Sequence, residues 1–329
     1  MVKLTLQHET WPLAGSFAIS RGAKTTAEVL TVTLEDEGGA VGRGECVPYA
    51  RYGESVPAVM GALEAARGTI EGGMTRDQVP DVVGLYAGRN ALDCALWDLE
   101  AKRSGTPVWQ LAGLDAPSTL ETAYTLGIDT PEVMAEAAAK HAARPLLKLK
   151  MGASDGRDAE RLRAIRAAVP DMRLIIDANE GWSPDALPGL LEVCAEIDVA
   201  LVEQPLPADD DGLLADIDRP IPVCADESAH DAAGLHKVVG KYDVVNIKLD
   251  KTGGLTNALH FAEAARAEGL DLFTGCMVAT SLAMAPAMLV AGMSSFVDLD
   301  GPLLLAHDRD PAIRFDGSLM HPAPPELWG

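Results

Sequence analysis

The feature that most constrains the fold is the regular recurrence of short apolar segments after residue 116. Eight such segments, four to eight residues long, begin 21 to 27 residues apart. They are 119–126, 146–151, 173–177, 200–203, 223–226, 244–248, 270–274 and 295–298. Most are separated by Ala-, Glu- and Arg-rich stretches, such as 157–168 and 257–268, that have the spacing of amphipathic helices. Eight strands alternating with helices favour a parallel α/β barrel, and a doubly wound parallel sheet is the alternative.

The first third of the chain has a mixed pattern instead. Residues 27–34 alternate and are rich in Val, Thr and Leu, which predicts a strand, and residues 39–47 follow a turn as its hairpin partner. Three stretches with helical spacing come next, at 56–68, 75–86 and 89–104. We therefore predict an α+β domain over 1–115, a barrel over 116–300 and a Pro-rich C-terminal segment over 301–329 that returns to the first domain.

Charge and cysteine content argue against several classes of protein. The chain carries 27 Lys and Arg against 49 Asp and Glu, a net charge of −22, and such a surface repels nucleic-acid phosphates and anionic lipid. The five cysteines include no CxxC pair, which disfavours a disulfide scaffold or a cysteine zinc site. The first residues lack the layout of a signal peptide, and the longest apolar stretch, 281–293, is too short to cross a bilayer. We expect a cytoplasmic protein without nucleic-acid or membrane partners, able to form a homo-oligomer.

Charged and amide side chains gather where six of the eight predicted strands end. They are Lys148, Lys150, Asp177, Asn179, Glu203, Asp226, Glu227, Lys248, Asp298 and Asp300. Residues two apart on a strand face the same side, so Lys148 and Lys150 can point together into the barrel mouth. Active sites of parallel barrels lie at this end. The alternative is that each of these groups is only a solvated turn residue.

Three of these carboxylates, Asp177, Glu203 and Asp226, come from consecutive strands. Neighbouring strands lie about 4.8 Å apart, so the three side chains can converge on one ion. No sulfur or imidazole accompanies them, and an all-oxygen set selects a hard cation such as Mg²⁺. Asn179 and Glu227 are better placed to contact the ligands than to bind the ion. Three independent salt bridges would be the purely structural alternative.

Lys150 and Lys248 lie on strands on opposite sides of an eight-stranded ring, with the predicted metal ligands between them. One lysine could remove a proton from one face of a bound carbon acid while the other donates to the opposite face. Nearby positive charge lowers the pKa of a lysine, which would help it act as a base. The alternative is that the lysines only neutralise the carboxylates.

Together these residues resemble the muconate-lactonising-enzyme subgroup of the enolase superfamily. The matching motifs are the KxK of Lys148 and Lys150, DANE at 177–180, EQPL at 203–206, ADES at 225–228 and NIKLDKTGGL at 246–255. The resemblance implies a (β/α)7β TIM-like barrel with an α+β capping domain built from both chain ends. It also implies one Mg²⁺ per subunit and proton abstraction next to a carboxylate by a lysine.

Within that subgroup the chain is similar to the dipeptide epimerases, because it carries Asp298-Leu299-Asp300. The resemblance implies that Asp298 and Asp300 bind the α-ammonium group of a dipeptide and that Lys148 polarises the substrate carboxylate. Arg21 is the candidate partner of a glutamate side chain. The expected reaction is 1,1-proton transfer at the α-carbon of the C-terminal residue, interconverting L-Ala-L-Glu and L-Ala-D-Glu in cell-wall (murein) peptide recycling.

Other activities on the same scaffold are the alternatives. They are a muconate-type cycloisomerase, an o-succinylbenzoate synthase, an N-acylamino acid racemase, or a dipeptide epimerase of different specificity. The acid pair Asp298 and Asp300 argues against the first three, whose substrates lack an ammonium group there. A non-catalytic barrel that binds small acids is disfavoured by the complete set of lysines and metal carboxylates.

Overall fold

The computed structural model describes residues 2–329, apart from the side chain of Ser16. The chain begins with an antiparallel sheet of three strands, β1 (Val2–Ile19), β2 (Gly22–Asp36) and β3 (Val41–Cys46). β2 and β3 confirm the predicted hairpin, whereas sequence analysis missed β1. Only the start of β1, at Val2 and Leu4, has buried apolar side chains. Beyond them β1 is an edge strand determined by its pairing with β2, which the sequence pattern does not reveal.

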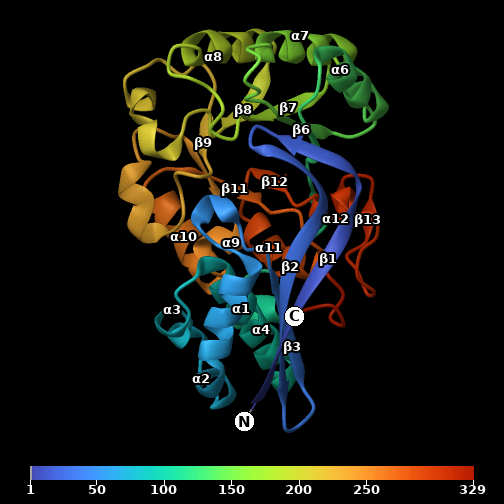
Figure 1. The fold of residues 1–329 in the computed structure, drawn as a ribbon, viewed down its shortest axis with the longest axis vertical. Helices are drawn as coiled ribbons and strands as arrows, with labels where there is room; N and C mark the ends of the chain where they lie inside the picture. Colours follow the sequence, from blue (N-terminus) through green and yellow to red (C-terminus); the bar gives the residue numbers. More distant parts are fainter. Residues whose placement is uncertain (1) are drawn as a thin grey trace.

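Helices and turns pack beside this sheet (Figure 1). They are η1 (Ala50–Tyr52), α1 (Val56–Ala65), α2 (Arg67–Glu71), η2 (Arg76–Gln78), α3 (Val79–Val82) and α4 (Tyr86–Ser104). The predicted helix 75–86 is only partly confirmed: η2 and α3 cover 76–82, and the chain then becomes extended at Val83 (φ −118°, ψ 117°). Gly44 lets β3 lie directly against α4, since a Cβ there would come within 2.1 Å of the Ala91 carbonyl oxygen.

Eight parallel strands form the barrel. They are β5 (Tyr124–Leu126), β6 (Leu146–Lys150), β7 (Arg173–Asp177), β8 (Val199–Glu203), β9 (Val223–Ala225), β10 (Val244–Ile247), β11 (Asp271–Gly275) and β12 (Phe296–Asp298). Each pairs with the next in chain order, and the Ala123 amide, just before β5, donates to the Val297 carbonyl of β12 at 2.8 Å. This confirms the predicted barrel and excludes a doubly wound sheet, whose strand order reverses at its middle.

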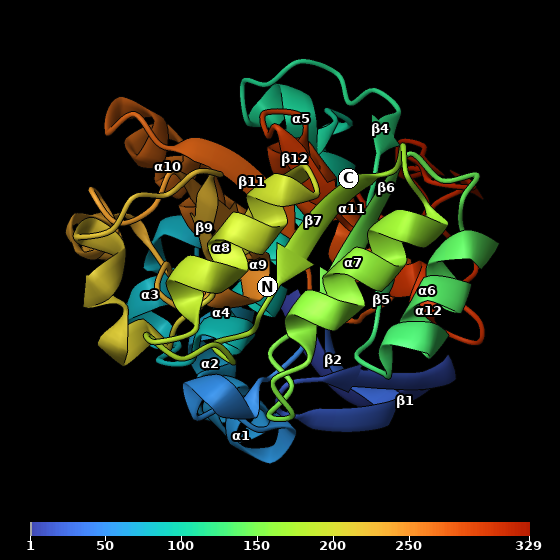
Figure 2. The ribbon, with the colours of Figure 1, turned by 90° about the horizontal axis from the view of Figure 1, so that it is seen from above.

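Helices form most of the crossovers on the outside of the barrel. They are α6 (Pro131–Lys140), α7 (Asp158–Ala168), α8 (Leu187–Glu196), α9 (Leu249–Thr252), α10 (Leu255–Ala267) and α11 (Ser281–Ala291). Figure 2 shows α6, α7 and α8 together on one side. Two crossovers use only 3-10 turns, η3 (Ala208–Asp210) with η4 (Gly212–Ala215), and η5 (Ala232–Lys237). No helix within residues 2–329 has the length and apolar character needed to span a membrane.

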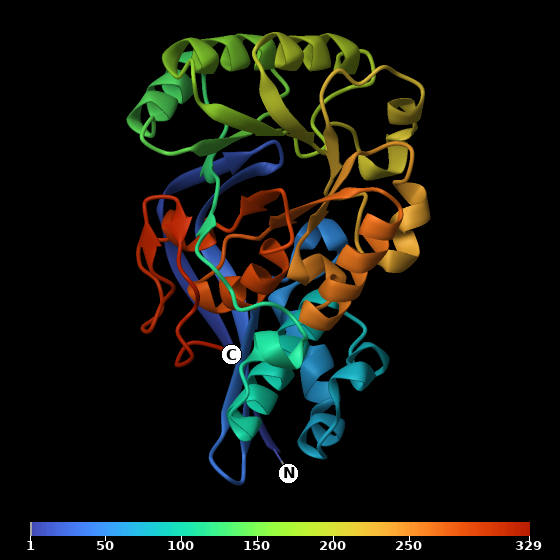
Figure 3. The ribbon, with the colours of Figure 1, turned by 180° about the vertical axis from the view of Figure 1, so that it is seen from behind.

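The C-terminal segment runs back from the barrel to the first sheet and α4 (Figure 3). It contains α12 (Gly301–Leu304), β13 (Phe315–Asp316) and β14 (Leu319–Met320), and β14 pairs with β4 (Leu120–Glu121), which follows α5 (Val108–Leu111). The predicted strand 119–126 is therefore split between β4 and the barrel strand β5. Trp328 Nε1 donates to the Cys94 carbonyl in α4 at 3.0 Å. These contacts support the three-part division at 115 and 300, which stays a prediction.

Candidate active site

The inside of the barrel changes from apolar to charged along its axis. Its amino-terminal part is filled by Ala123, Leu146, Ile175, Leu201, Cys224, Val244, Phe273 and Phe296. Two residues further along six of the same strands, the buried side chains are Lys148, Asp177, Glu203, Asp226, Asn246 and Asp298. Because alternate residues of a strand face the same side, the apolar layer fixes the direction of the polar one. The strand-end clustering predicted from the sequence follows directly.

Asp177, Glu203 and Asp226 form a buried carboxylate triad at the ends of β7, β8 and β9. One oxygen of each lies within 4.8 Å of the others, and none of the three is more than 2% exposed. Burial and the adjacent Asp177 raise the pKa of Glu203 to about 7. Lysine ammonium groups face the remaining oxygens, since Lys148 Nζ lies 2.7 Å from Glu203 Oε2 and Lys251 Nζ lies 2.6 Å from Asp226 Oδ1. An all-oxygen, electron-rich set of this kind fits a hard divalent cation such as Mg²⁺.

Lysines flank the triad on both sides. Lys150 Nζ lies 2.5 Å from Asp177 Oδ2, and Lys248 Nζ lies 2.6 Å from Asp226 Oδ2. Burial alone would lower the pKa of Lys248, but the facing carboxylates of Asp226 and Glu203 raise it. In this arrangement the shift is thus opposite to the lowered lysine pKa that sequence analysis expected.

Two further residues hold the triad and were not assigned from the sequence. Asn246 Nδ2 donates to Glu203 Oε1 at 2.6 Å, and the fully buried Lys251 lies 2.6 Å from Asp226 Oδ1. Asn246 is two residues before Lys248, so strand alternation could have identified it. Lys251 lies in α9, beyond the strand, where the period-two rule does not apply.

The predicted residues Arg21, Asn179 and Glu227 meet at the rim of the barrel. Arg21, at the tip of the β1–β2 hairpin, donates to the Asn179 carbonyl at 3.0 Å and to Glu227 Oε1 at 2.8 Å. It also lies 3.2 Å from Glu180 Oε2. Glu180 in turn receives two hydrogen bonds of 2.7 Å from Arg51. These contacts tie the first domain to the barrel mouth, and sequence analysis missed Glu180 and Arg51.

Asp298 and Asp300 stand on the other side of the mouth, near Lys148 and Thr125. Asp298 Oδ2 lies 2.7 Å from Lys148 Nζ, and Asp300 Oδ2 accepts a hydrogen bond from the Thr125 amide at 2.7 Å. Burial and the neighbouring Asp298 raise the pKa of Asp300 to about 7. Both aspartates line the same space as the catalytic candidates.

That space is a cavity of about 980 Å³ between the first domain and the barrel mouth. Nine of the eleven predicted site residues line it: Arg21, Lys148, Lys150, Asn179, Asp226, Glu227, Lys248, Asp298 and Asp300. Asp177 and Glu203 do not line the cavity themselves, but each forms an ion pair with a lysine that does. Acidic, basic and apolar side chains therefore line one cavity.

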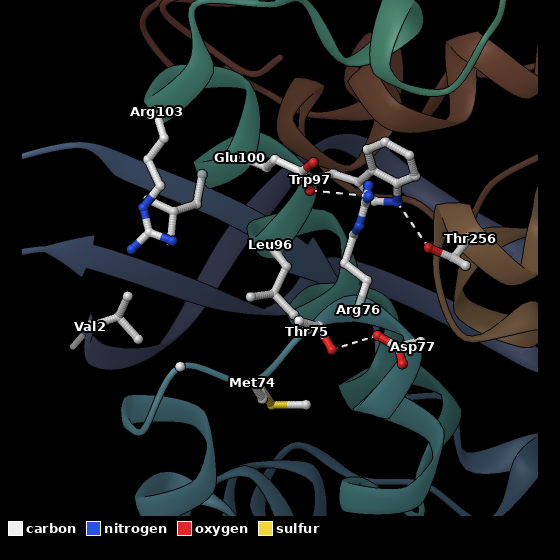
Figure 4. Close-up of a pocket in the computed structure, with 12 residues that line it drawn as sticks. Val2, Met74, Thr75, Arg76, Asp77, Leu96, Trp97, Glu100, Arg103 and Thr256 are labelled. Atoms are coloured by element: carbon white, nitrogen blue, oxygen red, sulfur yellow. Dashed lines mark hydrogen bonds and ion pairs between the residues drawn. The ribbon is translucent and has the colours of Figure 1, made fainter.

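A second cavity, of about 630 Å³, lies beside α4 and has different chemistry (Figure 4). The Arg76 guanidinium lies 3.2 Å from the centre of the Trp97 ring and pairs with Glu100 at 3.0 Å. Trp97 Nε1 donates to Thr256 Oγ1 at 2.9 Å. Val2, Met74 and Leu96 supply apolar walls. None of the described lysines lines this second cavity, whereas Lys148, Lys150 and Lys248 all line the cavity at the barrel mouth.

Comparison with known proteins agrees with this site. Residues 1–113 match the mandelate racemase/muconate lactonizing enzyme N-terminal domain, and residues 132–322 match the enolase C-terminal domain-like family. An L-Ala-D/L-Glu epimerase of Escherichia coli is 46% identical over 315 residues, 95% of this chain and 97% of the relative. An N-acetyl-D-glutamate racemase of Pseudoalteromonas is 43% identical over 290 residues, 88% of this chain and 91% of the relative.

A solved structure is also very similar over the full length. It is an enolase family member from Agrobacterium tumefaciens, with homology to dipeptide epimerases and with bound sodium and L-Ala-L-Glu. It is 51% identical, covers 100% of both chains and superposes with a TM-score of 0.97. The chain therefore belongs to the mandelate racemase/muconate lactonizing enzyme family of the enolase superfamily, as its motifs predicted.

Proposed function

We propose that this protein is a Mg²⁺-dependent dipeptide epimerase that interconverts L-Ala-L-Glu and L-Ala-D-Glu. The single observation that carries the proposal is the arrangement at the mouth. Lys150 and Lys248 flank a carboxylate triad from opposite sides, and the Asp298–Asp300 pair lines the same cavity. The relatives' activities on dipeptides and on N-acetylglutamate support the same reaction class.

Asp177, Glu203 and Asp226 would hold the metal ion, one per subunit. A bound Mg²⁺ supplies a Lewis acid that stabilises negative charge on a substrate carboxylate. Lys148, buried beside the triad, adds a second positive charge for that carboxylate. A bound cation would offset the charge of Asp226 and Glu203, which raises the pKa of Lys248, and would thereby favour the neutral amine that a general base needs.

The two lysines would then act on opposite faces of the α-carbon. One lysine, as the neutral amine, takes the proton from the α-carbon, and the electron pair of the broken C–H bond moves towards the carboxylate. The other lysine, as the ammonium, gives its proton to the opposite face of the same carbon. The configuration inverts, and the reverse reaction uses the same two groups with their roles exchanged.

Charge at the two ends of the cavity supports a dipeptide with an acidic C-terminal residue. Asp298 and Asp300 form a negative pole for the α-ammonium group. Arg21 is a cation at the opposite side, but most of its donors are already occupied by Asn179, Glu180, Glu227 and Tyr49. Lys24, exposed and 5.2 Å from the Tyr49 ring centre, is a second cation lining the cavity. Such an activity would serve recycling of Ala-Glu cell-wall peptides in the cytoplasm.

The decisive experiment follows the α-proton of glutamate by NMR in D₂O. The protein with Mg²⁺ and L-Ala-L-Glu should exchange this proton for deuterium and produce L-Ala-D-Glu. N-acetyl-L-glutamate, which lacks the ammonium group, should react much more slowly. Faster turnover of N-acetylglutamate would instead identify an N-acylamino acid racemase. No exchange with either substrate, nor with other dipeptides, would contradict the proposal.

A further inference from the structure

The two aspartates at the end of β12 have different partners. Asp298 Oδ2 lies 2.7 Å from Lys148 Nζ, and Asp298 Oδ1 accepts a hydrogen bond from Thr125 Oγ1 at 3.3 Å. Asp300 accepts a hydrogen bond from the Thr125 amide, and within residues 2–329 no lysine or arginine lies at ion-pair distance from it. Both side chains are almost completely buried, 4% and 3% exposed. Asp298 thus has a cationic partner at ion-pair distance, and Asp300 has none among the described residues.

The partner of Asp298 is shared with the metal-binding triad. Lys148 is 1% exposed, and its Nζ lies 2.7 Å from Glu203 Oε2 and 3.3 Å from Asp177 Oδ2 as well as 2.7 Å from Asp298 Oδ2. One buried ammonium group therefore connects two groups of carboxylates. With Phe273 5.1 Å away on the apolar side, Lys148 has no solvent into which it could withdraw its charge.

This sharing creates a competition for the triad. A divalent cation held by Asp177 and Glu203 would repel the Lys148 ammonium, because both are positive and both are attracted to these two carboxylates. Lys148 can move away from the triad only if another carboxylate remains paired with it, since an unpaired buried charge is strongly destabilising. Asp298 is the carboxylate in contact with Lys148 that does not belong to the triad. Asp300 makes no such contact and remains available to a cation from outside.

We propose that Asp298 is a positioning residue that draws Lys148 away from the metal-binding carboxylates, whereas Asp300 is the principal seat of the substrate ammonium group. The second half rests on the proposed function, and the first does not. An ammonium group at this pair also repels Lys148 towards Glu203 and Asp177. Metal binding and recognition of the dipeptide amino terminus are consequently coupled through one lysine, and such coupling is reciprocal.

Calorimetric titration of Mg²⁺ into the substrate-free protein tests the first half without any assay of activity. Asp298→Asn should weaken Mg²⁺ binding by about tenfold or more, because Lys148 then pairs only with the triad. Asp300→Asn replaces the neighbouring carboxyl group, which makes no ion pair with Lys148, and should change the affinity by less than about threefold. Circular dichroism checks that both variants are folded, and Asp298→Glu should recover most of the lost affinity. Equal Mg²⁺ affinities for the two Asn variants would overturn the proposal.

Substrate selectivity tests the second half. The ratio of kcat/KM for L-Ala-L-Glu to that for N-acetyl-L-glutamate should fall in both variants, and further in Asp300→Asn than in Asp298→Asn. A larger fall in Asp298→Asn would refute the role given to Asp300. If the wild-type protein turned over neither substrate, the proposed function would fail, and with it the role of Asp300. The Mg²⁺ affinities would still decide the role of Asp298.

Discussion

Glu180 offers the sharpest test of how the first domain is held on the barrel mouth. Its side chain, 10% exposed, receives two hydrogen bonds of 2.7 Å from Arg51 and one of 2.9 Å from the Ala208 amide. Arg21 adds a contact at 3.2 Å. Although burial would raise it, these hydrogen bonds hold the pKa of Glu180 below its usual value. At neutral pH the carboxylate is therefore charged, and it connects the hairpin tip, the segment around Arg51 and two barrel loops. We call these contacts of Glu180 with Arg21, Arg51 and Ala208 the clasp.

Removing this clasp should free the hairpin tip. Charge-assisted bonds contribute about 1.5–3 kcal/mol each, and because Arg51 and Arg21 are about one-third exposed, we discount their sum to about 2–3 kcal/mol. Glu180→Ala should then raise the undocked population roughly 30- to 150-fold. Trypsin cleavage after Arg21 and Lys24, followed by mass spectrometry, should accelerate accordingly, and the KM for the dipeptide should increase.

A matched control separates this effect from the general loss of an ion pair. Glu136→Ala breaks a pair with Lys140 of similar length, 2.8 Å, in which both side chains are more than two-thirds exposed, and an exposed pair contributes about 0–1 kcal/mol. The control should leave trypsin cleavage at the hairpin unchanged. If Glu180→Ala were cleaved no faster than Glu136→Ala, the clasp would not hold the tip.

Two further predictions concern the lysines and a buried acid. Lys150→Ala and Lys248→Ala should each abolish epimerisation, while one of them can still exchange the α-proton of a single enantiomer in D₂O; full activity in both would refute the two-base assignment. Burial raises the pKa of Asp250 to about 7, so the folded state binds more protons than the unfolded state between about pH 4 and 7, and stability falls as pH rises through that window. Asp250→Asn should therefore increase the free energy of unfolding at pH 8 by up to roughly 3 kcal/mol, which is measured as a higher thermal midpoint. Below pH 4 the midpoint should change little. An equal change at both pH values would contradict this reasoning.

The barrel and most of its functional residues were predictable because strand geometry is local. Once 173–177 and 200–203 are strands, period-two alternation puts Asp177 and Glu203 on the same side as the apolar Ile175 and Leu201. Parallel strands in chain order then bring successive carboxylates side by side. The sequence motifs identified the family, and the comparisons with known proteins confirm it.

Other features depended on contacts between distant parts of the chain. Arg51 and Glu180 are 129 residues apart, and neither stands out in a sequence with many surface charges. The edge strand β1 forms because β2 offers it a partner, and the predicted helix 75–86 breaks at Val83. Local propensity carries no information about such pairings.

The sequence by itself determined that carboxylates and lysines face one another at the mouth of a parallel barrel, because that follows from a repeat of strands and a period of two. Only the tertiary structure decided how the charges are shared. Lys148 could have paired with any nearby acid, yet it lies between Asp298 and Glu203, whereas Asp300 faces no cation among residues 2–329. Coulombic interactions fall with distance and grow with burial, so the partner of each charge depends on positions to within a fraction of an ångström, which no pattern of residue types specifies.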